Sequence, residues 1–157
     1  MPISKQLFKV AAGFSFAVTI FQVVVLFSPA WSLYFGAPAE LVSNELLLWV
    51  AGLIAAVIFA VFGLYALAGA GYLRSLPLLR PGLLVIGGIY ILRGLESIPQ
   101  LLIVVGVFQS SASVPLQSLV SSLVSLFIGL IYLTATLTGW QGLRSRTRGR
   151  AVNKGGF

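Results

Sequence analysis

The sequence contains no cysteine and no histidine, and only three of its residues are acidic. Without cysteine the chain can form no disulfide and no thiol redox centre, and without either residue type it cannot build the Cys/His sites that hold zinc. The Ser-His-Asp and Cys-His arrangements of nucleophilic catalysis are excluded for the same reason. The three carboxylates do not pair, because Glu40 and Glu45 lie in a connection and Glu96 lies inside an apolar segment. We therefore expect no enzyme, no cofactor and no metal site.

Charged residues are also scarce: they make up 8% of the 157 residues, whereas 59% are apolar. Soluble domains are about 25% charged and about 45–50% apolar, so a soluble fold of this size could not bury so much apolar surface. A bilayer removes that need, and a helix crosses it with about 20 mostly apolar residues. Four segments meet this requirement, at about residues 7–27, 46–68, 82–108 and 116–139. The first is longer than the apolar core of a signal peptide, which indicates an uncleaved helix.

The short connections between these segments predict an all-α fold, an integral membrane four-helix bundle formed by residues 1–143. Residues 144–157 are polar, basic and rich in glycine, so we expect a disordered tail. The net charge is +7, and the basic residues lie beside apolar segments, which favours membrane lipids with anionic headgroups over nucleic acid as partners. Four tail arginines are predicted to contact those headgroups, or else only to fix the topology: Arg144, Arg146, Arg148 and Arg150.

The distribution of basic residues indicates the orientation. Lys5 and Lys9 flank the start of the first segment, and Arg74 and Arg80 lie between the second and the third. The tail arginines follow the fourth segment, whereas the other two connections contain neither lysine nor arginine. By the positive-inside rule, both termini are cytoplasmic, and we expect a multi-pass protein of the bacterial inner (plasma) membrane.

Small and hydroxylated residues indicate where the helices touch, because close backbone approach does more than the hydrophobic effect to join helices in a bilayer. The predicted helix contacts follow a four-residue spacing in the second and fourth segments: Gly52, Ala56, Ala60, Ser121, Ser125 and Gly129. In the first segment Ser15, Thr19 and Gln22 share one helix face. In the third, Gly87 and Gly94 would let a neighbouring helix approach. We expect these faces to turn toward one another and away from lipid.

The third segment contains the costliest feature, a charge pair at Arg93 and Glu96. Each charge costs about 2.5–3.5 kcal/mol near the bilayer centre. A spacing of three residues lets the two side chains meet on one helix face. We predict a buried polar cluster of side chains on the same face or at the same depth: Arg93, Glu96, Gln22, Ser125, Tyr90, Ser97 and Gln100, with Tyr132 as a further candidate. Pro99 frees the carbonyl of Leu95 and is expected to bend this helix.

Two interpretations of this cluster stay open. Either Arg93 and Glu96 lock the register of the helices, or they line a polar cavity for a proton, an ion or a lipid headgroup. The lock agrees with our first hypothesis, a structural or accessory membrane protein without catalysis of its own that packs against itself or a membrane-protein partner. The alternatives are a minimal transporter or channel, and a module that binds a lipid or small molecule. A water-filled path to Glu96 favours transport, and a closed ion pair favours the accessory role.

Three short motifs carry a resemblance to known sequences: Gly69-Ala70-Gly71, Leu76-Pro77-Leu78-Leu79-Arg80, and Arg93-Gly94 followed by Pro99-Gln100. With them, the stretch from Gly69 to Leu102 resembles segments of small, uncharacterised four-span inner-membrane proteins of bacteria. The resemblance covers about a fifth of the chain. It implies placement in a membrane and no particular activity.

Overall fold

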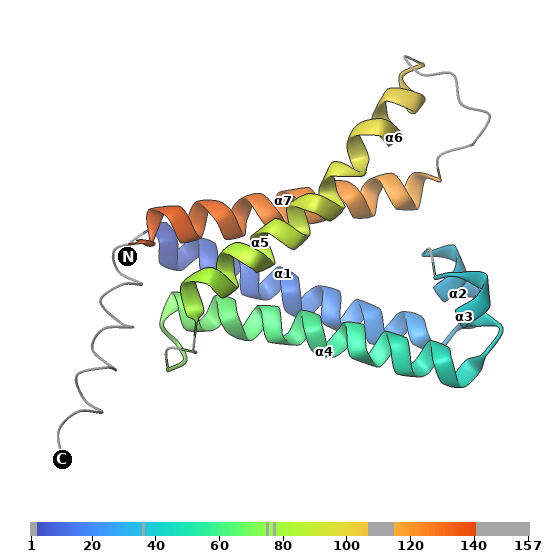
Figure 1. Cartoon of the computed structure of the whole chain (residues 1–157), viewed down its shortest axis with the longest axis horizontal. Helices are drawn as coiled ribbons and strands as arrows, with labels where there is room; N and C mark the ends of the chain where they lie inside the picture. The colour runs from blue at the N-terminus through green and yellow to red at the C-terminus, as the bar shows by residue number, and fades with distance from the viewer. Residues whose placement is uncertain (1–2, 36, 75, 77, 107–114, 141–157) are drawn as a thin grey trace.

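The computed structural model describes residues 3–35, 37–74, 76, 78–106 and 115–140, and these residues form helices and connections without any strand (Figure 1). The helices are α1 (Ile3–Leu26), α2 (Pro29–Tyr34), α3 (Ala39–Val42), α4 (Glu45–Ala70), α5 (Leu79–Leu95), α6 (Ser97–Val104) and α7 (Leu116–Thr138). The all-α prediction is confirmed. The predicted tail, with Arg144, Arg146, Arg148 and Arg150, lies outside the described residues, as does the domain boundary at residue 143.

Four helical stretches are long and apolar enough to cross a membrane: α1, α4, α5 continued by α6 over Leu79–Val104, and α7. We call these four stretches the spans. They agree with the predicted segments 7–27, 46–68 and 116–139 to within four residues at each end. The third predicted segment begins three residues late, at residue 82, and its end at Phe108 lies outside the described residues. Large apolar side chains such as Phe14, Val57 and Phe127 lie exposed on the outer faces, as expected where hydrocarbon surrounds the helices.

Local sequence determines where the helices begin and end. Asn44 precedes α4, and its side-chain oxygen accepts a hydrogen bond from the backbone N–H of Leu47. Gly71 ends α4 in the left-handed conformation, with φ of 91°, which glycine adopts without steric cost. In the connection between α1 and α4, Ser28 caps α2 and Pro29 occupies its first turn.

The four long helices form two closely packed antiparallel pairs, α1 with α4 and α5 with α7, and α1 also packs along α7 (Figure 1). The first turn of α1 and the end of α7 lie side by side, because a Cβ added to Gly139 would be 3.2 Å from Cβ of Ser4. Lys9 lies 5.0 Å from the ring centroid of Tyr72, which places the end of α4 there too. We call this end of the bundle the basic end; its described cations are Lys5, Lys9, Arg74 and Arg80. Glu40 and Glu45 lie at the opposite end, on α3 and at the start of α4.

Glycines bring the paired helices into close contact. On α5, a Cβ at Gly94 would lie 2.5 Å from the backbone Cα of Leu126 on α7, and on α7 a Cβ at Gly129 would lie 2.8 Å from the backbone nitrogen of Ile91. Between α1 and α4, Gly52 packs directly against the side chain of Leu26. Of the predicted contact residues, Gly52, Ala56, Ser125 and Gly129 are buried, whereas Ala60 and Ser121 are half-buried.

Candidate functional site

The third span, Leu79–Val104, is interrupted at Glu96, between α5 and α6. Proline has no backbone N–H, so Pro99 cannot bond to the carbonyl of Leu95, and α5 ends at that residue. The hydroxyl of Ser97, the first residue of α6, donates a hydrogen bond of 2.7 Å to the carbonyl of Gly94. The helix is interrupted where Pro99 predicts a bend, and Ser97 is buried at this interruption rather than facing Arg93 or Glu96.

The prediction that Arg93 and Glu96 are buried within one chain is wrong. Both side chains are exposed, and the described residues contain no ion pair between them. The reason is the contact between α5 and α7. Gly87 and Gly94 are seven residues apart, so both face α7, and α7 packs against α5 at these two residues. At about 100° per residue, Glu96 points to the opposite side of α5 and Arg93 lies about 100° from Gly94.

Among the described residues, no hydrogen bond joins Ser125, Gln100 or Gln22 to Arg93 or Glu96. The Ser125 hydroxyl donates to the carbonyl of Ser121 in its own helix, at 2.8 Å. Gln100 Nε2 donates to the hydroxyl of Ser118 on α7 at 3.1 Å, and its Oε1 is buried without a partner. Gln22 is half-buried on α1. The hydroxyl groups on α7 mostly bond within that helix, as serine and threonine commonly do in apolar surroundings.

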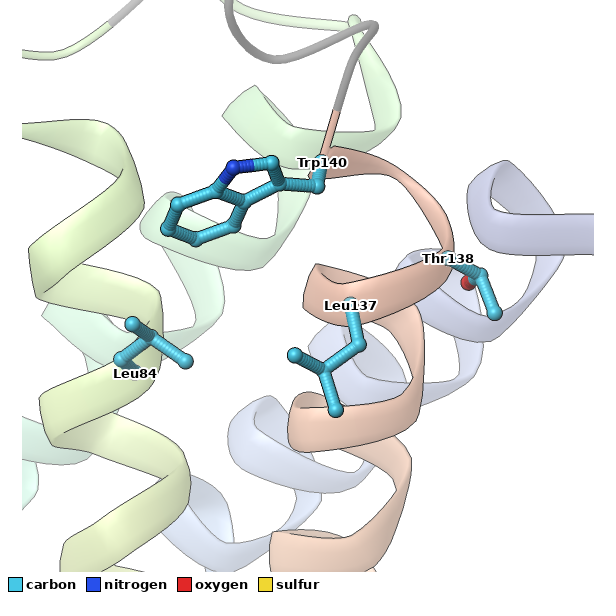
Figure 2. Close-up of a pocket in the computed structure, with 4 residues that line it drawn as sticks. All are labelled: Leu84, Leu137, Thr138 and Trp140. Atoms are coloured by element: carbon cyan, nitrogen blue, oxygen red, sulfur yellow. The ribbon is translucent and has the colours of Figure 1, made fainter.

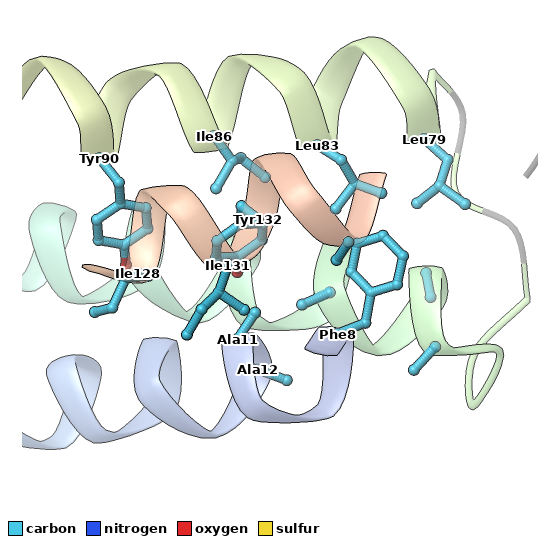
Figure 3. Close-up of a cluster of buried hydrophobic side chains, with 14 residues drawn as sticks. Phe8, Ala11, Ala12, Leu79, Leu83, Ile86, Tyr90, Ile128, Ile131 and Tyr132 are labelled. Carbon is cyan, nitrogen blue, oxygen red and sulfur yellow. The ribbon is translucent and has the colours of Figure 1, made fainter. Parts of the chain in front are cut away.

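A different set of polar side chains meets at the centre of the bundle. The Ser15 hydroxyl on α1 lies 2.8 Å from the Tyr132 hydroxyl on α7 and 3.5 Å from the Tyr90 hydroxyl on α5. Tyr132 also donates a 2.9 Å hydrogen bond to the backbone carbonyl of Phe62 on α4. Figure 3 shows Tyr90 and Tyr132 facing each other from α5 and α7 within the buried core. We call Ser15, Tyr90, Tyr132 and the Phe62 carbonyl the central hydroxyl cluster.

The hydrogen bonds of this cluster run in one direction. A carbonyl only accepts, so the single hydroxyl hydrogen of Tyr132 belongs to the Phe62 carbonyl. Ser15 must then donate to Tyr132, which leaves its oxygen free to accept from Tyr90. Every hydroxyl hydrogen has an acceptor, and each member lies on a different span. The cluster therefore ties all four spans together at one depth.

Aromatic packing reinforces this junction. The rings of Tyr90 and Tyr132 are stacked, with centroids 5.8 Å apart and planes at 16°. Phe59 and Phe62 of α4 pack against the ring of Tyr90, at 6.1 Å and 5.8 Å between centroids. Tyr132 is fully buried, at 0% exposure, as is Ser15. Offset aromatic pairs contribute about 0.5–1.5 kcal/mol to stability beyond the effect of their buried area, so this cluster stabilises the packing of the helices.

The groups in the central hydroxyl cluster are suited to joining helices. It holds no carboxylate and no cation, and its hydrogen bonds end on a backbone carbonyl. Among the described residues, no group of three or more His, Cys, Asp or Glu could hold a metal ion. The sequence pattern predicts that Ser15 lies on an inward face and that Tyr90 and Tyr132 are candidates for a polar cluster, but it places both tyrosines with Arg93. Depth is a signal in the sequence that pairs Ser15 with Tyr90, because both lie near the middle of their spans.

Removal of the Ser15 hydroxyl tests this assignment. Ser15→Ala is expected to lower the free energy of unfolding by about 1 kcal/mol, because Tyr90 loses its acceptor and Tyr132 its donor. Ser125→Ala is the matched control, since that buried serine bonds only within its own helix, and we expect little change. Equilibrium unfolding in mixed micelles with increasing SDS measures both. If both variants lose the same free energy of unfolding, Ser15 does not join the helices through Tyr90 and Tyr132.

A second polar site lies at the basic end. The guanidinium of Arg80, in the first turn of α5, lies 4.6 Å from the ring centroid of Trp140, and its Nη2 donates to the Trp140 carbonyl at 2.6 Å. The Arg80 Nε is buried without an acceptor. Beside this pair is a groove of about 680 Å³ between α5 and α7, lined by Leu84, Leu137, Thr138 and Trp140 (Figure 2). Arg93 and Glu96 do not line it.

Neither family models, curated proteins nor solved structures gave a match to this chain. The resemblance of the stretch from Gly69 to Leu102 therefore gains no support from these comparisons. Function has to be inferred from the geometry of the central hydroxyl cluster, the exposed charge pair and the groove at the basic end.

Proposed function

We propose that this chain is a structural or accessory multi-pass protein of the bacterial inner membrane, with both termini cytoplasmic and no catalysis of its own. In this proposal it works as an assembly component, and its α5 surface at Arg93 and Glu96 packs against a second copy. The observation that supports the proposal is the exposure of two opposite charges in the middle of an otherwise apolar span.

The depth of the two charges makes their exposure costly. Along Leu79–Val104, Arg93 lies within about 2 Å of the middle and Glu96 within about 7 Å, at 1.5 Å per residue. An arginine side chain at that depth is too short to reach the headgroups across about 15 Å of hydrocarbon. Each charge facing lipid costs about 2.5–3.5 kcal/mol. A protein surface that covers the pair and supplies counter-charges removes most of this cost.

The order of the charges favours a second copy of the same chain. A two-fold axis along the membrane normal places equivalent residues at equal depth and makes the contact self-complementary. Arg93 then faces Glu96 of the second copy, and the reverse pair forms as well. The two residues differ in depth by about 4.5 Å, which the arginine side chain can span. One basic and one acidic group per chain therefore neutralise each other without a third partner.

The surroundings of the pair also suit helix packing. Leu92 is exposed, at 69%, and Gly88 has no atom within 4 Å of where its Cβ would lie. Gly88, Leu92 and Glu96 follow a four-residue spacing and form one stripe along α5. A small residue on an exposed stripe lets a second helix approach closely. Transport through Glu96 instead needs a water path to it, and the described groove lies at the basic end.

The absence of cysteine provides a direct test of this surface. We expect Leu92→Cys to form a disulfide-linked dimer in oxidised membranes, because equivalent residues meet near the two-fold axis. Val57→Cys on α4 is the control: it lies near the middle of its span and is 62% exposed, but on another face. Equal cross-linking of the two variants, or of neither, contradicts the proposed interface.

Charge exchange tests the reciprocal ion pairs. Arg93→Glu places like charges together and is expected to weaken dimerisation at least about tenfold. The double variant Arg93→Glu, Glu96→Arg restores the opposite charges and should recover dimerisation to near that of the original chain. Energy transfer between labelled copies in liposomes measures both. If the single variant dimerises normally, or if a different membrane protein covers Leu92 in cross-linking, the second copy is the wrong occupant.

A further inference from the structure

The basic end contains a charged side chain that no acidic residue of the chain can neutralise. Arg80 is held in place by the Trp140 ring and by the Trp140 carbonyl, which carries no net charge. All three side-chain carboxylates lie elsewhere: Glu40 and Glu45 at the opposite end, and Glu96 near the middle of the third span. The counter-charge for Arg80 therefore has to come from outside the described fold.

We propose that the groove between α5 and α7 binds an anionic phospholipid, with its phosphate at Arg80 and an acyl chain between Leu84 and Leu137. This site is separate from the α5 stripe at Leu92 and Glu96, and it does not depend on the proposed assembly. The guanidinium offers five N–H donors in a planar fork that matches phosphate oxygens, and the structure records an acceptor for Nη2 alone among the described residues.

The walls of the groove suit an acyl chain. Leu84 lies four residues after Arg80 on α5, so it lies on the same face one turn deeper into the bundle. Leu137 is 65% exposed on the α7 side, and Figure 2 shows both leucines below the indole of Trp140. The Thr138 hydroxyl donates to the carbonyl of Thr134, at 2.6 Å, so its hydrogen is already bonded within α7. The site thus has a cation at one end and two leucine side chains along its walls.

The charge around the groove favours an anionic over a zwitterionic lipid. Lys5, Lys9, Arg74 and Arg80 are the described charged side chains at this end, and all four are cations. A choline headgroup would bring a further cation toward them, whereas a phosphatidylglycerol headgroup carries only the phosphate charge. Indole rings favour the layer between headgroups and hydrocarbon, where Trp140 would contact both parts of the lipid.

Lipid binding to the purified full-length protein in mild detergent tests the site, with phosphatidylglycerol and phosphatidylcholine compared by native mass spectrometry. We expect phosphatidylglycerol to bind more tightly, and Arg80→Gln to weaken its binding about fivefold and remove the preference. Arg74→Gln is the matched control, because Arg74 lies in the connection before α5, is exposed, and does not line the groove. It should leave the affinity within about twofold.

A second pair of variants tests the apolar part. Leu137→Trp fills the groove and is expected to weaken the binding of both lipids, whereas Leu130→Trp, at an exposed position two turns away on α7, should not. Both replaced leucines face outward, so both variants should fold. If Arg80→Gln and Arg74→Gln lose the same affinity for phosphatidylglycerol, the proposal is overturned, since the basic residues then attract the lipid without a specific site. Competition by inorganic phosphate alone overturns it too, because a free anion would then suffice.

Discussion

Replacing Tyr132 with alanine is expected to destabilise the bundle by about 3–5 kcal/mol, the range for removing a large buried aromatic side chain. Tyr132 is fully buried, stacks on Tyr90, and bonds to both Ser15 and the Phe62 carbonyl. The change therefore leaves a cavity where α1, α4, α5 and α7 meet, and leaves hydrogen-bonding groups from two helices without partners. Equilibrium unfolding in mixed micelles with increasing SDS measures the loss.

Tyr132→Phe separates packing from hydrogen bonding in the same experiment. It keeps the ring and removes only the hydroxyl, so we expect a loss of about 1 kcal/mol. If phenylalanine costs as much as alanine, the hydrogen bonds rather than the stacked rings hold the spans together. If neither variant is less stable than the original chain, the central hydroxyl cluster does not join the helices.

Gly94→Ala is expected to destabilise the chain by about 1–3 kcal/mol, although alanine is otherwise the better helix former. The new Cβ would lie 2.5 Å from Cα and 2.6 Å from the backbone nitrogen of Leu126. Backbone atoms cannot rotate away as a flexible side chain does, so α5 and α7 have to separate along their whole contact.

Gly13→Ala is the matched control for this prediction. Gly13 is inside α1, exposed, and has no atom within 4 Å of the new Cβ. There we expect a gain of about 0.5–1 kcal/mol from helix propensity alone. The two glycine variants should thus change the free energy of unfolding in opposite directions in SDS titrations. A stabilised Gly94→Ala variant means that α5 and α7 do not cross at Gly94.

The elements of the fold could be predicted because their causes are local. Composition and apolar run length give the four spans to within a few residues. The missing N–H of Pro99 predicts a bend near Leu95, and α5 ends at that residue. Gly94 and Gly129 could be predicted as contact points, since only small residues let helix backbones approach each other.

The candidate sites were harder to predict, because each depends on how one helix is rotated and shifted against another. Helical spacing shows that Arg93 and Glu96 share a side of α5 with Tyr90, but not which part of that side turns inward. The crossing at Gly94 decides this, and it buries Tyr90 while Arg93 and Glu96 remain exposed. Similarly, Arg80 and Trp140 are sixty residues apart in the chain, and only the antiparallel packing of α5 and α7 brings them together.

The sequence by itself determined that this is an all-helical chain with four apolar segments, and that one of them carries a charge pair. These properties follow from the free energy of transferring each side chain into hydrocarbon and from the backbone chemistry of each residue, neither of which depends on distant parts of the chain. Only the tertiary structure decided that Ser15, Tyr90 and Tyr132 form the buried polar junction, and that the charges face outward. The physical reason is that a few close glycine contacts fix the helix rotations, and those rotations select which polar groups meet at one depth.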